Sequence, residues 1–322
     1  MHYLKRYGSD PIAYSTIQSG LRDYYIADSG YASYASCLGS HFILGSIICS
    51  DKDLENFATE VIKDLGCPSF VQINKSFARL LHDHFGYKVT KIGVESQLHT
   101  QSYELSNDYK KRNLRSYIRK GERQSNIYEL TIEGLSKQFD ISVGDIECVT
   151  KQWLSQKKRK KQIRFLTRET IYEDEPGVRK FYSIDKNNEL IGFVFFNPIY
   201  SEGETVGYCA DHMRVVKGAS KGHVAYIIMK AFEKLKQEGI SYLSLGLSPF
   251  YRLGSDTDFK ESLGLRALFQ FLYRYGNRLH NFKGLSSYKA QFRGDEHDVY
   301  VATKSINPIK DVLAFHKYMG LI

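Results

Sequence analysis

The chain has 322 residues, of which 42% are hydrophobic and 25% charged, and its formal net charge is +9. This composition supports a sizeable core and argues against a chain that is mainly disordered. The longest apolar run, residues 42–49, is far shorter than the roughly 20 residues that span a bilayer. The N-terminus lacks the apolar segment of a signal peptide, and the five cysteines show no close CxxC pairing, so we expect a cytoplasmic protein with reduced thiols.

The first third of the chain predicts a β-meander followed by alternating helices and strands. Short apolar segments separated by turn residues favour strands, and apolar residues at spacings of three and four favour helices. The expected elements are strands at residues 24–26, 31–34, 42–48, 69–73 and 88–95 and helices at residues 51–65 and 76–84. This order predicts an α+β unit of about 100 residues, within the usual size range of a domain.

Much of the positive charge lies in two clusters, residues 110–123 and 157–168. The first reads as an amphipathic helix, and the second is a block of like charge that repels itself unless it is solvated or bound to an anion. Two such clusters favour a polyanionic partner, either nucleic acid or an anionic membrane, over a merely solvated surface. The candidate phosphate-binding or tRNA-binding residues are Lys111, Arg112, Arg115, Arg119, Lys158 and Arg159.

The remainder of the chain repeats the order of the first third more clearly. An antiparallel meander precedes a long helix, whose apolar face includes Ala225, Ile228 and Phe232, and Gly239 is expected to end that helix. The expected elements are strands at residues 178–184, 190–198, 204–213, 240–245 and 300–303 and helices at residues 141–156, 222–238 and 263–271.

Three antiparallel strands, a crossover helix and a further strand resemble the core of the GNAT N-acyltransferase fold. The resemblance implies an α+β protein of two tandem GNAT-like domains, each a mixed central sheet flanked by helices. We expect an N-terminal domain at residues 1–105 and a catalytic domain at residues 106–322 that begins with the basic helix.

Acetyl-CoA users of this fold hold the pyrophosphate in a Gln/Arg-x-x-Gly-x-Gly/Ala loop at a helix start. Residues 214–222 contain glycines without that spacing, so acetyl-CoA is the weaker donor hypothesis. Lys217 and Lys221 in this segment are candidates for binding a phosphate or carboxylate. The alternative is an ordinary helix-capping loop, since glycine loops alone are weak signals.

Several spaced motifs resemble the catalytic region of the phosphatidylglycerol lysyltransferases. They are Asn113-Leu114-Arg115, Asp211-x-x-Arg214, Gly246-Leu247-Ser248-Pro249-Phe250, Gly276-Asn277-Arg278, and Asn281-Phe282-Lys283-Gly284-Leu285 followed by Tyr288-Lys289-x-x-Phe292. The resemblance implies transfer of an amino acid from aminoacyl-tRNA to a lipid hydroxyl, or to another small acceptor, without a cofactor. Members usually carry a membrane-embedded region, and we expect a soluble member that contacts the inner membrane surface peripherally.

The resemblance also assigns roles to single residues. Asp211 is suited to pair with the amino group of the amino acid, Arg214 to hold the tRNA terminus or an acceptor phosphate, and Lys289 to stabilise an oxyanion or a phosphate. The alternative for Asp211 and Arg214 is a structural pair at a strand end. The candidate substrate-binding residues are Ser248, Asn281, Tyr288 and Asp311.

Other interpretations stay open at this stage. Phe282, Tyr288 and Phe292 are as well explained as core aromatics of a curved strand, and no arrangement of His, Asp and Glu has metal-ligand spacing. The leading hypothesis is an aminoacyl-tRNA-dependent aminoacyltransferase. The alternatives are a CoA-dependent N-acyltransferase and a non-catalytic protein that binds tRNA or a membrane surface. The amino acid, the acceptor and the oligomeric state do not follow from the sequence.

Overall fold

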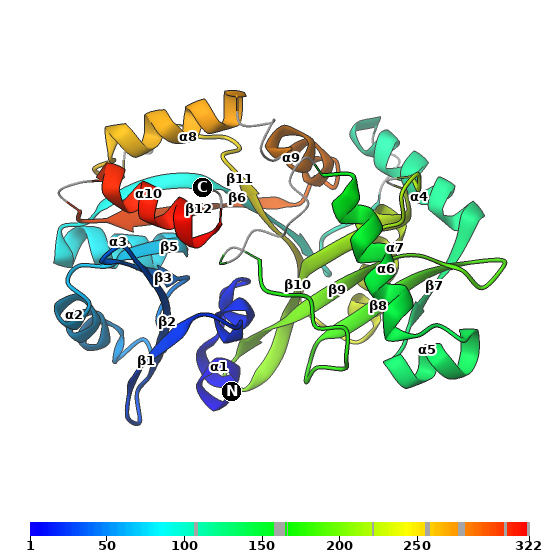
Figure 1. The fold of residues 1–322 in the computed structure, drawn as a ribbon, viewed down its shortest axis with the longest axis horizontal. Coiled ribbons are helices and arrows are strands. Elements are labelled where there is room, and N and C mark those ends of the chain that lie inside the picture. Colours follow the sequence, from blue (N-terminus) through cyan, green and yellow to red (C-terminus); the bar gives the residue numbers. More distant parts are fainter. Residues whose placement is uncertain are drawn as a thin grey trace.

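One mixed β-sheet runs through the molecule and is flanked by helices (Figure 1). The computed structural model describes residues 1–105, 109–157, 165, 167–220, 222–254, 258–275, 281–305 and 308–320. The strands follow the order β1-β2-β3-β5-β12-β6-β11-β10-β9-β8-β7, and β4 pairs with β2 outside this path. The predicted α+β architecture is therefore confirmed as a single continuous sheet.

The elements of the sheet and its helices have the following bounds. The strands are β1 (Arg22–Ile26), β2 (Gly30–Cys37), β3 (Ser40–Leu44), β4 (Ile48–Cys49), β5 (Ser69–Ile73), β6 (Lys88–His99), β7 (Ser125–Glu129), β8 (Arg179–Asp185), β9 (Leu190–Ser201), β10 (Glu204–Val215), β11 (Tyr242–Pro249) and β12 (Asp295–Thr303). The α-helices are α1 (His2–Tyr7), α2 (Leu54–Asp64), α3 (Lys75–Phe85), α4 (Arg112–Gln124), α5 (Ile132–Phe139), α6 (Val143–Ser155), α7 (Gly222–Gln237), α8 (Leu263–Tyr275), α9 (Phe282–Ala290) and α10 (Pro308–Tyr318).

The same connection occurs twice along the chain. In each repeat an antiparallel meander leads through a helix into a strand parallel to the last meander strand, β3 with β5 across α2 and β10 with β11 across α7. The last strands of the two repeats are exchanged, because β6 pairs with β11 while β12 lies between β5 and β6. Both repeats thus share one sheet, and the division into domains at residue 105 stays a prediction.

Helices cover both faces of the sheet because alternate side chains along its strands enter different apolar clusters. In β9, Val194 and Phe196 join the cluster under α7, whereas Phe193 and Phe195 join the cluster under α5 and α6. In the other half of the sheet, one cluster includes residues of α2 and α3 and the other includes residues of α8 and α10. The described helices include none that is long and apolar enough to cross a membrane.

Most predicted elements occur within a few residues of their expected bounds. In the motif region, the curved strand considered as an alternative for Phe282 and Tyr288 is not present, because these residues lie in helix α9. This helix begins after Asn281, whose side chain accepts a hydrogen bond from Gly284 N at 2.9 Å. This is a standard N-cap interaction. The spacing of Leu285 and Tyr288, three residues apart within α9, is the helical signal that aromatic composition obscured.

Two glycines allow α4 and α7 to pack closely. A β-carbon at Gly121 would lie 2.7 Å from Cβ of Tyr226 and 2.8 Å from the carbonyl oxygen of Gly222. Both distances are too short for real atoms, so the helix contact requires glycine at position 121. The basic helix is thereby fixed against the start of α7.

We predict that Gly121→Ala destabilises the protein by about 1–3 kcal/mol, since overpacking forces the two helices apart. Gly144 in α6 is the matched control, because its β-carbon would meet only Ser142 Oγ at 3.5 Å. Gly144→Ala should be neutral or stabilising by up to about 1 kcal/mol. Urea unfolding measures both changes, and equal effects of the two substitutions would contradict the proposed close contact.

Candidate active site

The sheet opens between β10 and β11, where the two strands stop pairing. Their parallel register covers only Gly207–Cys209 against Tyr242–Ser244. Beyond it, β10 has an irregularity between Ala210 and His212 and β11 has one between Ser244 and Leu247. Bulges of this kind bend a strand and redirect its side chains. A cavity of about 830 Å³ lies at this opening and is lined by residues of both repeats.

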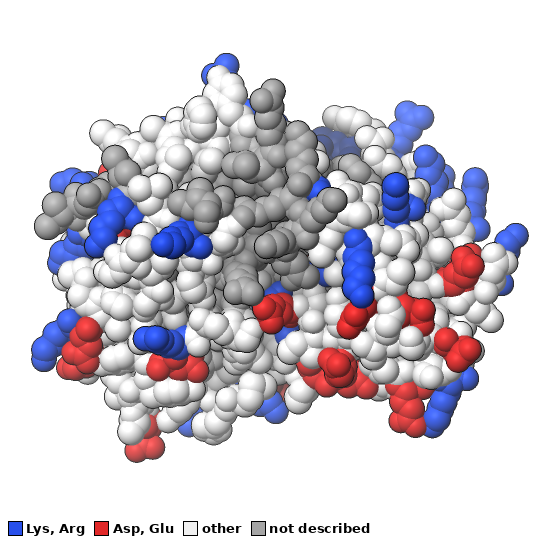
Figure 2. All heavy atoms as spheres, in the orientation of Figure 1, with Lys and Arg blue, Asp and Glu red and all other residues white. Residues whose placement is uncertain are grey.

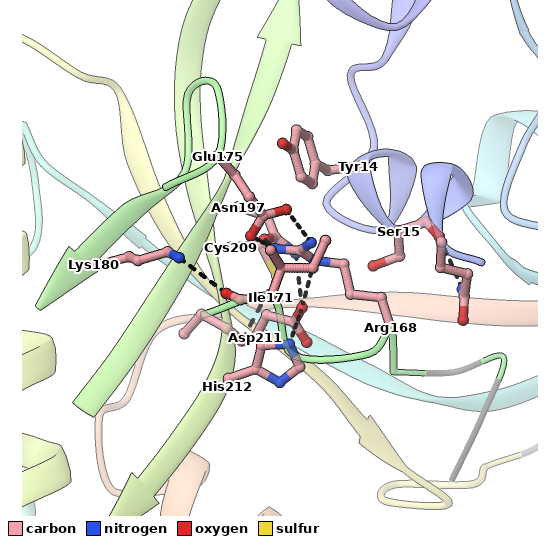
Figure 3. Close-up of polar contacts among 12 residues, drawn as sticks. Tyr14, Ser15, Arg168, Ile171, Glu175, Lys180, Asn197, Cys209, Asp211 and His212 are labelled. Atoms are coloured by element: carbon pink, nitrogen blue, oxygen red, sulfur yellow. Dashed lines mark hydrogen bonds and ion pairs between the residues drawn. The ribbon is translucent and has the colours of Figure 1, made fainter. Parts of the chain in front are cut away.

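The carboxylate of Asp211 lies in the cavity wall, within a buried polar network (Figure 3). Its Oδ2 accepts a hydrogen bond from Asn197 Nδ2 at 2.9 Å, and lies 3.3 Å from Arg168 Nε and 3.4 Å from His212 Nε2. Within the described part of the chain, all these contacts fall on Oδ2. The other oxygen, Oδ1, is therefore the one that could accept a hydrogen bond from a ligand.

Arg168 is the centre of this network (Figure 3). Its guanidinium donates to both oxygens of Glu175, at 2.5 and 3.0 Å, and to Asn197 Oδ1 at 2.9 Å. It also lies over the ring of Tyr14, 5.2 Å from the ring centroid. Because Arg168 is only 2% exposed, its charge depends on these partners for compensation.

Arg214 lies in the same cavity wall as Asp211. It is buried, donates to Thr150 Oγ1 at 3.0 Å, and lies 5.1 Å from the ring centroid of Trp153. Its NH2 group also lies 3.3 Å from His212 Nδ1. Arginine only donates, so Nδ1 accepts and the imidazole proton belongs on Nε2, facing Asp211. Burial lowers the pKa of His212 to about 4, so this ring is neutral at pH 7.

Lys289 and Glu95 bring opposite charges to the same cavity from the two repeats. Lys289 is buried on α9 and donates to the carbonyl oxygen of Leu247 at 2.9 Å. Glu95 is buried on β6 and accepts from Gln97 Nε2 at 2.9 Å. Burial lowers the pKa of Lys289 to about 8, against the opposing effect of the nearby acidic groups, and raises the pKa of Glu95 to about 7. Both groups can therefore exchange protons near neutral pH.

The predicted substrate-binding residues occupy different positions. Asn281 and Tyr288 line the cavity, Asn281 as the cap of α9 and Tyr288 with its hydroxyl enclosed and without a hydrogen-bond partner among the described residues. Asp311 also lines the cavity and accepts from Ser40 Oγ at 2.6 Å. Ser248 is buried in β11 and is not part of the cavity lining.

One end of the cavity, here called the apolar end, is lined mainly by apolar side chains, together with Asp311 and His316 of α10. This end lies between the sheet and two helices, α8 and α10, of the second repeat. Its lining includes Phe42, Val71, Ile92, Val301, Leu265, Leu268, Phe269, Phe315 and Met319. One cavity thus joins ionisable groups to an apolar compartment.

Among the predicted basic residues, those that the structure describes are not part of the cavity lining. Arg112 and Arg119 on α4 are exposed, and Figure 2 shows Lys and Arg side chains along the side of the molecule where α4 lies. Arg115 is partly buried, and Lys111 donates to the carbonyl of Glu104 and lies 3.9 Å from the ring centroid of Tyr103. Lys217 is exposed in the loop before α7. Lys158, Arg159, Lys221 and the motif at residues 276–278 lie outside the described residues.

Sequence reasoning missed three residues of the site. Arg168 was counted in a cluster expected to meet a polyanion, yet it is buried and paired with carboxylates. Glu95 is the acidic residue of a predicted apolar strand, which is the signal that could have identified it. Asn197 occupies a comparable place in β9. The described residues contain no group of three His, Cys, Asp or Glu that could hold a metal ion.

Comparisons with known proteins agree on one family. The family model described as phosphatidylglycerol lysyltransferase, C-terminal, matches residues 1–303. A phosphatidylglycerol lysyltransferase of Bacillus subtilis (strain 168) is 25% identical over 250 residues, and the match spans 77% of this chain and 28% of that protein.

Two solved structures share the fold. The structure of L-PGS from Bacillus licheniformis has a TM-score of 0.80 at 20% identity, covering 100% of this chain and 95% of that one. The C-terminal domain of an Agrobacterium fabrum protein has a TM-score of 0.70 at 17% identity, covering 95% and 90%. The whole sheet, with both repeats, therefore belongs to the shared fold.

We predict that Arg168→Met destabilises the protein by about 3–5 kcal/mol, because it leaves two carboxylates in a buried site without their cation. The matched control is Arg112→Met on the exposed face of α4, which should change stability by less than about 0.5 kcal/mol. Urea unfolding at pH 7 measures both. A loss of less than about 1 kcal/mol for Arg168→Met would mean that the network is not the main support of this wall.

The buried carboxyl of Glu95 predicts a pH dependence. Its pKa is near 7 in the folded chain and 4.5 at its ordinary value. Its contribution to stability is therefore fully present below pH 4.5 and is lost as the pH rises through 7. Wild type should lose about 2–3 kcal/mol relative to Glu95→Gln between pH 5 and pH 8. Urea unfolding of both proteins at the two pH values tests this, and an unchanged difference would contradict the raised pKa.

Proposed function

We infer that this chain, which belongs to the phosphatidylglycerol lysyltransferase C-terminal family, is an acyltransferase that moves an amino acid from aminoacyl-tRNA to a lipid hydroxyl. The chain spans about 28% of the length of its Bacillus subtilis relative. The observation that carries the proposal is the cavity at the opening of the sheet, which both Asp211 and Lys289 line.

The proposed reaction needs positioning more than a strong nucleophile. The acceptor hydroxyl oxygen attacks the carbonyl carbon of the aminoacyl ester, and the bond from that carbon to the tRNA ribose oxygen then breaks. The proton of the acceptor hydroxyl ends on the released ribose hydroxyl, so the reaction is balanced without another reactant. Asp211 Oδ1 would hold the α-ammonium group of the amino acid, and Lys289 would donate to the developing oxyanion.

Glu95 and Lys289 also suit the proton transfer. Their pKa values of about 7 and about 8 allow one to accept and the other to release a proton near neutral pH. Arg214, which contacts Thr150 and Trp153 and lines the cavity, is assigned in this proposal to bind a phosphate of either substrate.

The helix contact between α4 and α7 supports aminoacyl-tRNA over an acyl-CoA as donor. In CoA-dependent enzymes of this fold the amides at the start of the corresponding helix hold pyrophosphate. Here Gly121 of α4 packs against Gly222 at that start, and Ser220 accepts hydrogen bonds from the amides of Gly222 and His223. The exposed cations Arg112 and Arg119 of α4 fit the tRNA backbone instead.

The proposal also covers the division of the chain into two units and the location of the protein in the cell. We take the two topological repeats as tandem acyltransferase-like units that meet near residue 105, with the second supplying Asp211, Arg214 and Lys289. The basic residues suit either tRNA or an anionic membrane surface, so we place the protein in the cytoplasm with peripheral contact to the inner membrane. The acceptor is a phosphatidylglycerol-like lipid or, as the second candidate, a small molecule.

We predict that Asp211→Asn and Lys289→Met each lower amino-acid transfer by at least about 100-fold, since each removes a charge that meets the reacting ester. Labelled aminoacyl-tRNAs are incubated with phosphatidylglycerol vesicles and a small-molecule extract, and the lipid and aqueous products are separated. Asp295→Asn, which changes a largely exposed carboxylate, is the control and should leave transfer unchanged. Circular dichroism and tRNA binding check that the variants remain folded.

Other outcomes would support the competing functions. Transfer from an acyl-CoA in the absence of tRNA would overturn the donor assignment. Label that stays on tRNA in every reaction, with tRNA binding retained, would favour a non-catalytic binding protein.

A further inference from the structure

Helix α8 is apolar on two opposite sides. Its inward side chains, Leu265, Leu268, Phe269 and Leu272, line the apolar end of the cavity. On its outward side, Leu263 is 77% exposed, Phe271 58% and Tyr275 57%. A helix of a soluble protein normally places polar side chains opposite its buried stripe. The exposed apolar residues of α8 therefore need an explanation other than packing within this chain.

The charged side chains of α8 are all positive. Residues 263–275 contain Arg266 and Arg274 and no Asp or Glu. Arg266 pairs with Glu261, whereas the guanidinium of Arg274 lies 5.5 Å from the ring centroid of Tyr275 at the exposed end of the helix. Aromatic and leucine side chains beside arginine, without acidic residues, are typical of helices that lie in the interface of an anionic membrane.

The neighbouring helix α10 continues this surface. Figure 1 shows α8 along one edge of the molecule with α10 beside it, and both pack on the same apolar cluster. The outward residues of α10 are Lys310, Leu313 and Lys317, of which Leu313 is 51% exposed. The outward faces of α8 and α10 therefore both carry exposed apolar and basic side chains.

We propose that the outward face of α8, formed by Leu263, Phe271, Arg274 and Tyr275, docks on the surface of an anionic lipid bilayer. The occupant is a bilayer because the same helix lines the apolar end of the cavity on its other side. A lipid acceptor must bring its hydroxyl to Asp211 and Lys289 while part of its alkyl chains stays in an apolar environment. Docking through α8 puts that compartment next to the membrane.

This inference rests on the proposed function only for the choice of a lipid acceptor. The surface itself makes a separate prediction, since vesicle binding does not require catalysis. The basic face of α4 is a different region of the molecule and would still be available to tRNA (Figure 1). Vesicle binding and transfer can therefore fail independently in an experiment.

The test uses the whole chain and vesicles of phosphatidylcholine with or without phosphatidylglycerol, in a flotation assay. The double substitution Phe271→Gln and Leu263→Gln should weaken binding to phosphatidylglycerol vesicles by about tenfold or more, because two partly inserted apolar side chains are lost. Arg274→Gln should weaken binding to anionic vesicles by a smaller factor and leave binding to neutral vesicles unchanged. The control is Tyr25→Gln, since Tyr25 is 62% exposed on β1, far from α8 along the sheet.

Transfer is then measured with two acceptors, phosphatidylglycerol in vesicles and a short-chain, monodisperse phosphatidylglycerol. The double substitution should lower transfer to vesicles by about the same factor as binding and leave transfer to the short-chain acceptor within about twofold. Equal vesicle binding by wild type and the double variant would overturn the proposal. The proposal would also be overturned if light scattering showed that wild type is a dimer, that the double substitution dissociates it, and that vesicle binding is unchanged.

If wild type transfers nothing to either acceptor but binds vesicles through α8, the proposed function fails and the docking surface stands. If transfer to both acceptors is normal in the double variant, the function stands and α8 is not the docking surface.

Discussion

The exchange of the final strands between the two repeats is the constraint from which the candidate site follows. Strand β6 belongs to the first repeat along the chain, yet it pairs with β11 of the second, while β12 enters the sheet beside β5. Neither repeat can complete its sheet alone. Glu95 on β6 therefore lies in the same cavity as Lys289 and Asp211, although it precedes them by more than a hundred residues.

Burying charged groups in this cavity has a cost that the surrounding contacts partly offset. Arg168 compensates the carboxylates of Glu175 and Asp211, and it is positioned by Asn197, which contacts both Arg168 and Asp211. Lys289 and Glu95 are less completely compensated, and the result is a pair of shifted pKa values near neutrality. Buried ionisable groups with shifted pKa values are common at functional sites, because a group whose pKa lies near the ambient pH can both accept and release a proton. The network around Arg168 balances buried charges, whereas Lys289 and Glu95 are the groups whose protonation changes near neutral pH.

The sequence predicted local features better than long-range ones, for physical reasons. Periodicity placed α7 and β5 within a residue of their bounds, because each has a clear apolar pattern and turn residues at its ends. Asp211, Arg214 and Lys289 were identified by motif, and all three line one cavity. The exchange of β6 and β12 depends on pairing between distant segments, and no local pattern specifies it. The sequence assigned Arg168 to a surface cluster because its burial depends on Asn197 of β9 and Asp211 of β10, although its partner Glu175 is near it along the chain.

The cavity has different chemistry at its two ends, and this difference bears on the acceptor. A small polar metabolite would gain little from the compartment lined by Phe42, Leu265 and Phe315, because such a molecule has no apolar surface to bury there. An acceptor with an alkyl chain would gain roughly 0.8 kcal/mol for each buried methylene group, so even a few methylenes shift the preference by orders of magnitude. The proposed docking also accounts for the apolar side chains on both sides of α8. One side lines the compartment, and in the proposed docking the other side becomes buried at the bilayer. The apolar lining of the cavity thus favours the lipid over the small-molecule acceptor, and the proposed docking of α8 on a bilayer builds on that choice.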